Sequence, residues 1–104
     1  MKAEEIFRKK QSYDLEKTVK LETAVGQVIE IVGAEVYTSS KFGSDFSVIE
    51  DSAGNLYFTW SAVVTEKVAE LVALPVEEWQ GLEVTVTKNT AESGFEYLNL
   101  ELPE

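Results

Sequence analysis

Apolar and polar residues alternate with the two-residue period of β-strands in several stretches of this chain. Residues 21–37 form the longest such stretch, rich in valine and isoleucine, and its apolar positions change phase at Gly33. A one-residue phase change at a glycine is typical of a β-bulge, so we predict a long, bent first strand. Residues 45–61 hold two shorter apolar-aromatic runs around the segment 51–55, DSAGN, and are predicted to form a β-hairpin.

Because side chains alternate between the two faces of a strand, the apolar positions predict which side chains of the later strands face the core. In the second strand of the first hairpin, we expect Leu56, Phe58 and Trp60 inside and Tyr57 on the outer face. Residues 82–89 and 95–102 alternate on either side of a turn and are predicted to form a second hairpin. Leu82, Val84 and Val86 are expected to face inward, and Leu98, Leu100 and Leu102 are expected to share one face of the last strand.

A helical period separates the two hairpins. Residues 62–74 carry an apolar stripe at Val64, Val68, Leu71 and Val72. Thr65 is the expected N-cap, and Pro75 ends the helix because the residue before a proline is disfavoured in the α region. We expect Trp79 to fold back as a plug just before Gly81.

The predicted order of elements is β-β-β-α-β-β in one mostly β domain of 104 residues. Residues 1–20 are expected to form a basic, partly helical segment, and residues 21–104 a barrel. The bulge at Gly33, the DSAGN turn, the helix before Pro75 and the last two strands together resemble the OB-fold over residues 22–102. That resemblance implies a five-stranded Greek-key barrel with one helix between strands 3 and 4. An SH3-like barrel or another α+β meander shares much of this order.

The amino-acid composition limits the catalytic and metal-binding chemistry that this chain can perform. The chain has no cysteine and no histidine, which removes disulfides, thiolate sites, the commonest general base and the commonest transition-metal ligand. Its acid pairs are adjacent in sequence, so they point apart on strands, and no catalytic motif is present. We therefore predict a protein that is not an enzyme and uses no metal or cofactor. No signal peptide or membrane-length apolar run is visible, which predicts a cytoplasmic protein without a membrane partner.

Charge is distributed unevenly along the chain. The net charge is −10, but six of the nine bases lie within the first 20 residues, including Arg8, Lys9 and Lys10. The acidic remainder argues against non-specific binding to polyanions, and solubility alone also accounts for it.

The resemblance to the OB-fold implies a ligand face across strands 2 and 3, between the loops that join strands 1–2 and 4–5. Aromatic and basic residues that fall near this face are the candidate nucleic-acid-binding residues: Tyr37, Lys41, Phe42, Tyr57, Lys88, Phe95 and Tyr97, with Arg8, Lys9 and Lys10 as an accessory cluster. The length, acidic body and organisation also resemble those of small phage single-stranded-DNA-binding proteins. We expect binding to oligo-dT, with steep weakening by salt and quenching of aromatic fluorescence.

Other interpretations of the same residues remain open. The outer aromatics could pair only with one another across strands. The chain could instead be an acidic protein–protein interaction or assembly domain, with a protein partner or a second copy and no nucleic-acid ligand. An oligosaccharide-binding module is a third possibility, for which the sequence offers nothing specific.

Overall fold

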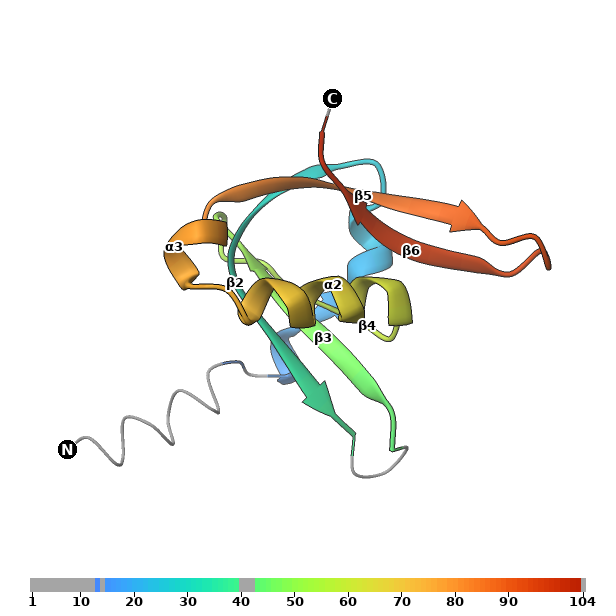
Figure 1. Cartoon of the computed structure of the whole chain (residues 1–104), viewed down its shortest axis with the longest axis horizontal. Helices are drawn as coiled ribbons and strands as arrows, with labels where there is room; N and C mark the ends of the chain where they lie inside the picture. The colour runs from blue at the N-terminus through green and yellow to red at the C-terminus, as the bar shows by residue number, and fades with distance from the viewer. Residues whose placement is uncertain (1–12, 14, 40–42, 104) are drawn as a thin grey trace.

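The computed structural model describes residues 13, 15–39 and 43–103, which form a curled, mostly β structure with one main helix (Figure 1). One six-stranded mixed sheet has the order β1-β4-β3-β2-β5-β6. Its strands are β1 (Val19–Lys20), β2 (Val28–Thr38), β3 (Asp45–Asp51), β4 (Leu56–Thr59), β5 (Leu82–Thr90) and β6 (Glu96–Glu101). The helices are the 3₁₀ turns η1 (Leu15–Lys17) and η2 (Leu21–Ala24), then α2 (Ala62–Val72) and α3 (Val76–Trp79).

The long strand β2 belongs to both halves of the curled sheet. Its first residues pair with β5, and its later residues pair with β3. The register shifts between Ile31 and Gly33, which confirms the predicted bulge. Residues 21–24, expected in this strand, form η2 instead. The bulge lets one strand turn from one pairing partner to the other, so the sheet curls into a half-barrel (Figure 1).

A sixth strand was not predicted. The two residues of β1 pair in parallel with β4, Val19 with Tyr57 and Lys20 with Phe58. The prediction of five strands was therefore wrong, since the sheet has this short edge strand in addition. Alternation cannot be detected in a strand of two residues.

Helix α2 lies where the helical period predicts it, but its N-cap is Ser61 rather than Thr65. The Ser61 side chain accepts a hydrogen bond from the Val64 amide, whereas the buried Thr65 hydroxyl lies 3.2 Å from the Ser47 hydroxyl of β3. Pro75 is the N-cap of the short helix α3, and Trp79 at its end is buried as expected. No helix within the described part of the chain is long and apolar enough to cross a membrane.

The core lies between α2 and the face of the sheet that α2 covers. Its buried residues are Leu21, Ala24, Ile29, Ile31, Ile49, Tyr57, Val64, Val68, Trp79, Val84, Val86 and Leu100. Strand β4 enters this core with the opposite parity to the prediction. Tyr57 faces inward opposite Ile49, while Leu56 and Phe58 are half-buried on the outer face. The sequence misleads here because the more apolar residues of β4 lie on the face of the sheet that points away from α2.

Strand β6 is an edge strand whose backbone is protected by side chains of α2 and its cap. The Ser61 hydroxyl donates to the Leu98 carbonyl at 2.7 Å. The Lys67 ammonium group donates to the Leu100 carbonyl at 2.8 Å and to the Asn99 side chain at 2.7 Å. These bonds satisfy carbonyls that an open edge would present to another chain. Of the three leucines predicted to share one face here, Leu100 is buried, Leu98 is half-buried, and Leu102, which follows β6, is exposed.

Candidate nucleic-acid interface

Three aromatic rings form a strip that begins on the sheet face that points away from α2 and ends beside the start of α2. Tyr37 of β2 and Phe46 of β3 are register partners, and their rings stack with centroids 5.5 Å apart. Phe46 also contacts Trp60, which directly follows β4, at a centroid distance of 4.7 Å. Because the neighbouring Val36 packs against the core, Tyr37 must point to the opposite face. Trp60 is 46% exposed. We call Tyr37, Phe46 and Trp60 the aromatic strip.

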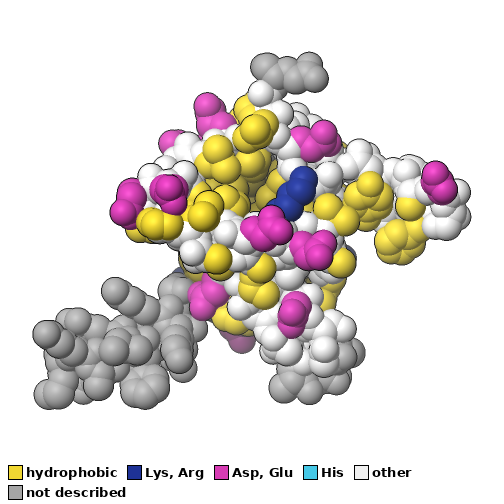
Figure 2. All heavy atoms as spheres, in the orientation of Figure 1, with side chains coloured by type: hydrophobic (Ala, Val, Ile, Leu, Met, Phe, Trp, Pro, Cys, Tyr) yellow, Lys and Arg dark blue, Asp and Glu magenta, His cyan; other side chains and the backbone are white. Residues whose placement is uncertain are grey.

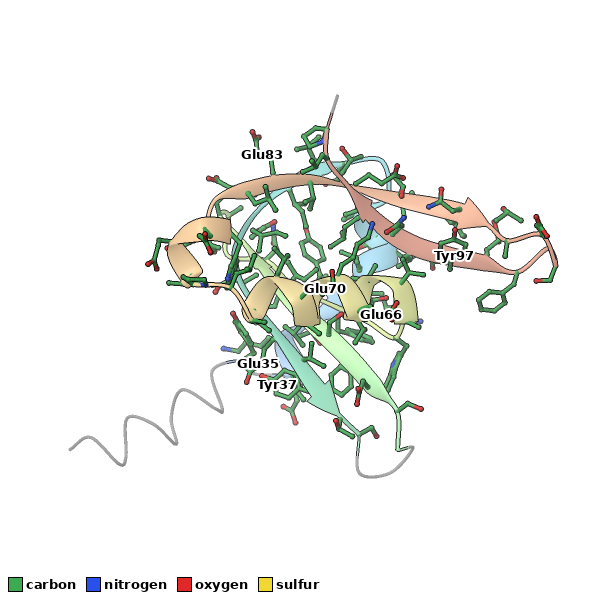
Figure 3. The ribbon with its side chains drawn as sticks, viewed as in Figure 1. Glu35, Tyr37, Glu66, Glu70, Glu83 and Tyr97 are labelled. Carbon is green, nitrogen blue, oxygen red and sulfur yellow. The ribbon has the colours of Figure 1, made fainter. Side chains whose placement is uncertain are left out.

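The strip continues into a groove beside the β5–β6 hairpin. This hairpin groove has a volume of about 710 Å³ and lies between the end of β4, the start of α2 and the hairpin. Trp60 lines it together with Phe95, which is 70% exposed, and Tyr97. Figure 3 shows Tyr97 on the hairpin, which projects from the rest of the sheet. Five aromatic side chains thus follow one path from the end of β2 to the β5–β6 turn.

The charged groups of the hairpin groove largely neutralise one another. The Lys88 ammonium lies 3.4 Å from the Glu22 carboxylate and 3.8 Å from that of Glu96, with all three side chains partly exposed. Exposed pairs of this kind contribute about 0–1 kcal/mol, so Lys88 can exchange a glutamate for another anion at little cost. The groove nevertheless holds two carboxylates and one ammonium group.

The structure brings some of the predicted site residues together. Tyr37 lies in the aromatic strip, and Lys88, Phe95 and Tyr97 lie in the hairpin groove. Five other predicted residues lie outside the described residues: Arg8, Lys9, Lys10, Lys41 and Phe42.

The placement of Tyr57 on the outer face was wrong. Its side chain is only 8% exposed and belongs to the core. Burial and the neighbouring Asp51 carboxylate raise the pKa of its phenol. Its ring therefore cannot stack on a ligand. The rings of Trp60 and Phe46 are the ones available for stacking instead. Sequence reasoning missed these two because it assigned Trp60 to the core and did not have the β2–β3 register that pairs Phe46 with Tyr37.

Tyr13 packs on the same outer face at Gly33, in the middle of β2. Its hydroxyl lies against Gly33, where any Cβ would collide with it and would also come within 3.2 Å of a Glu50 side-chain oxygen. The absence of a side chain at Gly33 therefore allows the close approach of Tyr13. Burial, and then the nearby Glu50 and Glu35 carboxylates, raise the pKa of the Tyr13 phenol to about 12.

Replacing Tyr13 with phenylalanine should change how stability depends on pH in the alkaline range. The folded-state pKa of about 12 lies above the ordinary value of 10, so the unfolded chain loses this proton first as pH rises. The contribution of Tyr13 to stability is present below pH 10 and lost between pH 10 and 12. We expect the unfolding midpoint of the wild type to fall more steeply over this window than that of Tyr13→Phe. Parallel midpoint-against-pH curves from urea unfolding would contradict this placement of Tyr13.

Comparison with protein-family models, with characterised proteins and with solved structures gave no significant match to this chain.

Proposed function

We propose that this chain is a non-catalytic protein that binds single-stranded DNA by stacking bases on the aromatic strip and in the hairpin groove. The row of aromatic side chains from Tyr37 to Phe95, which stack in the aromatic strip and share the hairpin groove through Trp60, is the observation that carries the proposal. Stacking on aromatic side chains contributes about 1–3 kcal/mol per base and tolerates any base, because every base has a π-face. A single strand can splay its bases onto such a path, whereas the bases of a duplex are stacked on one another.

The resemblance to the OB-fold supports the same choice of face. Without β1, the sheet order of the five longer strands runs from β4 through β3, β2 and β5 to β6, with α2 between the third and fourth of them in sequence. OB-fold proteins bind oligonucleotides across the strands that come second and third in the sequence, and across the adjoining loops. In this chain, that region corresponds to β3, β4 and the β5–β6 turn, along which the aromatic path runs.

Few cations accompany the aromatic path, so the proposed binding depends mainly on stacking. Lys88 lines the hairpin groove, and Lys20 lines a smaller hollow beside Trp60. Lys41 lies between β2 and β3 in sequence. Each phosphate contact to a single strand contributes about −0.7 to the slope of log affinity against log salt. Three lysines therefore predict a slope of about −2.

A titration of fluorescein-labelled oligo-dT with the full chain at several salt concentrations tests the proposal. We expect binding at low salt, a slope of about −2, and a slope shallower by about 0.7 for Lys88→Gln. Lys17→Gln is the matched control, because Lys17 lines neither the hairpin groove nor the hollow beside Trp60. Its slope should equal that of the wild type. Absence of binding at low salt would disprove the proposal.

Glu96→Gln distinguishes a nucleic-acid ligand from a basic protein. Glu96 competes with phosphate for Lys88 and repels a polyanion, so removal of its charge should tighten oligo-dT binding by roughly 1.5- to 5-fold. A basic partner would instead lose an attractive contact. Weaker or unchanged oligo-dT binding by Glu96→Gln would show that the groove does not receive the phosphate backbone.

A further inference from the structure

A second groove lies on the other side of the contact between α2 and β6. It has a volume of about 560 Å³ and shares no residue with the hairpin groove. The hydrogen bonds from Ser61 and Lys67 to β6 lie between the two grooves. We call it the leucine groove, after the residues that line it: Leu71, Leu74, Leu82, Leu100 and Leu102, with Val84, Lys67, Glu70 and Glu101.

Large apolar side chains at the leucine groove are exposed to solvent. Leu74 is 48% exposed and Leu102 is 71% exposed. Val72 and Val76 add exposed apolar surface at the adjoining ends of α2 and α3. Figure 2 shows apolar side chains gathered in a hollow between α2 and the β5–β6 strands. Contiguous apolar surface of this kind marks a docking site more often than an ordinary solvent-facing surface.

The rim of the leucine groove is acidic. Glu70 stands on α2, where Figure 3 shows it on the exposed side of the helix, and Glu101 ends β6. Among the described residues, Lys67 is the one cation of the rim, and its ammonium group donates to Asn99 and to the Leu100 carbonyl. An occupant that matches this rim needs apolar side chains next to positive charges.

The chain itself contains one segment with this chemistry. Ile6 and Phe7 are followed directly by Arg8, Lys9 and Lys10, the only run of three consecutive bases in the sequence. The apolar pair suits the leucines of the groove, and the three bases suit the carboxylates of Glu70 and Glu101.

A second copy of the chain can supply this segment more readily than the same copy. Tyr13 is held at Gly33, on the sheet face that points away from α2, whereas the leucine groove lies on the α2 side. The six residues from Phe7 to Tyr13 span at most about 20 Å when fully extended. Within one copy they would have to pass around the edge of the sheet.

We propose that residues 6–10 of one copy dock in the leucine groove of a second copy. Such a contact joins two different surfaces, so it is heterologous and can repeat from copy to copy in an open chain. The aromatic strip and the hairpin groove share no described lining residue with the leucine groove, so the proposed contact leaves the proposed DNA-binding residues free of it. Self-association of this kind requires no DNA, and its test is therefore independent of the proposed DNA binding.

Light scattering coupled to size exclusion, on the full chain without DNA, tests this interface. We expect the mass of the wild type to rise above the monomer with protein concentration and to fall with salt. Leu74→Glu, which changes the groove, and the triple variant Arg8→Glu/Lys9→Glu/Lys10→Glu, which changes the segment, should each remain monomeric. Val28→Ser is the control for loss of an exposed apolar side chain outside both grooves, and it should associate as the wild type does.

Mixing the two monomeric variants gives the decisive result. In this mixture, the triple variant supplies an intact groove and Leu74→Glu supplies an intact segment. A two-chain complex and nothing larger should therefore form. A wild type that stays monomeric at every concentration, a segment variant that still associates, or a mixture that stays monomeric would each overturn the proposal. If circular dichroism shows that Leu74→Glu does not fold, Leu102→Glu replaces it, because Leu102 is the more exposed groove residue.

Discussion

Replacing Trp60 with alanine is expected to weaken the binding of oligo-dT by roughly 5- to 150-fold, the equivalent of about 1–3 kcal/mol for one lost stacking partner. Trp60 should show the largest effect among the aromatics because it belongs to both parts of the path. It contacts Phe46 in the aromatic strip and also lines the hairpin groove. Its removal therefore interrupts the path at its midpoint. Fluorescence anisotropy of a labelled oligo-dT measures the change.

Trp60→Phe separates stacking from general damage to the surface. Phenylalanine keeps a ring at this position, so affinity should fall much less than in Trp60→Ala. Quenching of the intrinsic tryptophan fluorescence by DNA provides a second measurement. The chain has two tryptophans, and Trp79 is buried in the core, so quenching by DNA should come from Trp60 alone. Trp60→Phe should therefore bind DNA with no quenching of tryptophan fluorescence.

Two results would contradict this role of Trp60. Equal affinities for the wild type and Trp60→Ala would show that the strand follows another path. Quenching that persists in Trp60→Phe would place DNA near Trp79, which is incompatible with binding at the outer face. Trp60 is half-exposed and follows β4 rather than lying inside it, so its removal should leave the fold intact. Circular dichroism of Trp60→Ala provides that control.

The fold was predictable from the sequence wherever a single residue determines a local backbone feature such as a bulge, a helix end or a turn. The phase change at Gly33 predicted the bulge, and Pro75 marked the break between α2 and α3. The DSAGN turn was predictable for a similar reason, since Asp51 accepts hydrogen bonds from the Ala53 and Asn55 amides inside the turn. These signals are local, and the backbone responds to them wherever the chain folds.

The face of β4 was not predictable from its own residues. Both parities of this strand carry large apolar or aromatic side chains, so alternation identifies the strand but not its inner side. The choice depends on long-range packing, because Tyr57 and Ile49 join the same buried core as Val64 and Val68 of α2, whereas Phe58 and Trp60 lie outside it. This long-range contact also determined the candidate site, because the aromatic strip consists of residues of the outer parity.

The curl of the sheet that positions the aromatic strip depends on Ile31. This residue pairs with Asp51 of β3 and with Leu82 of β5, and its carbonyl accepts a hydrogen bond from the Gly81 amide at 2.7 Å. Its side chain is fully buried in the core. Ile31 thus lies where the two halves of the sheet meet, and its side chain packs both halves against α2.

Replacing Ile31 with alanine is expected to destabilise the fold by about 2–5 kcal/mol, since it leaves a cavity in a packed interior. Domains of this size are stable by only about 5–15 kcal/mol, so the loss should lower the unfolding temperature by roughly 8–20 °C. Ile31→Val removes one methylene group and should cost about 0.5–1.5 kcal/mol. Val28→Ala, at a position on the same strand that is 51% exposed, is the matched control and should stay within about 0.5 kcal/mol of the wild type. Thermal and urea unfolding followed by circular dichroism measure all three, and equal losses for Ile31→Ala and Val28→Ala would refute the packing of Ile31 between the two halves of the sheet.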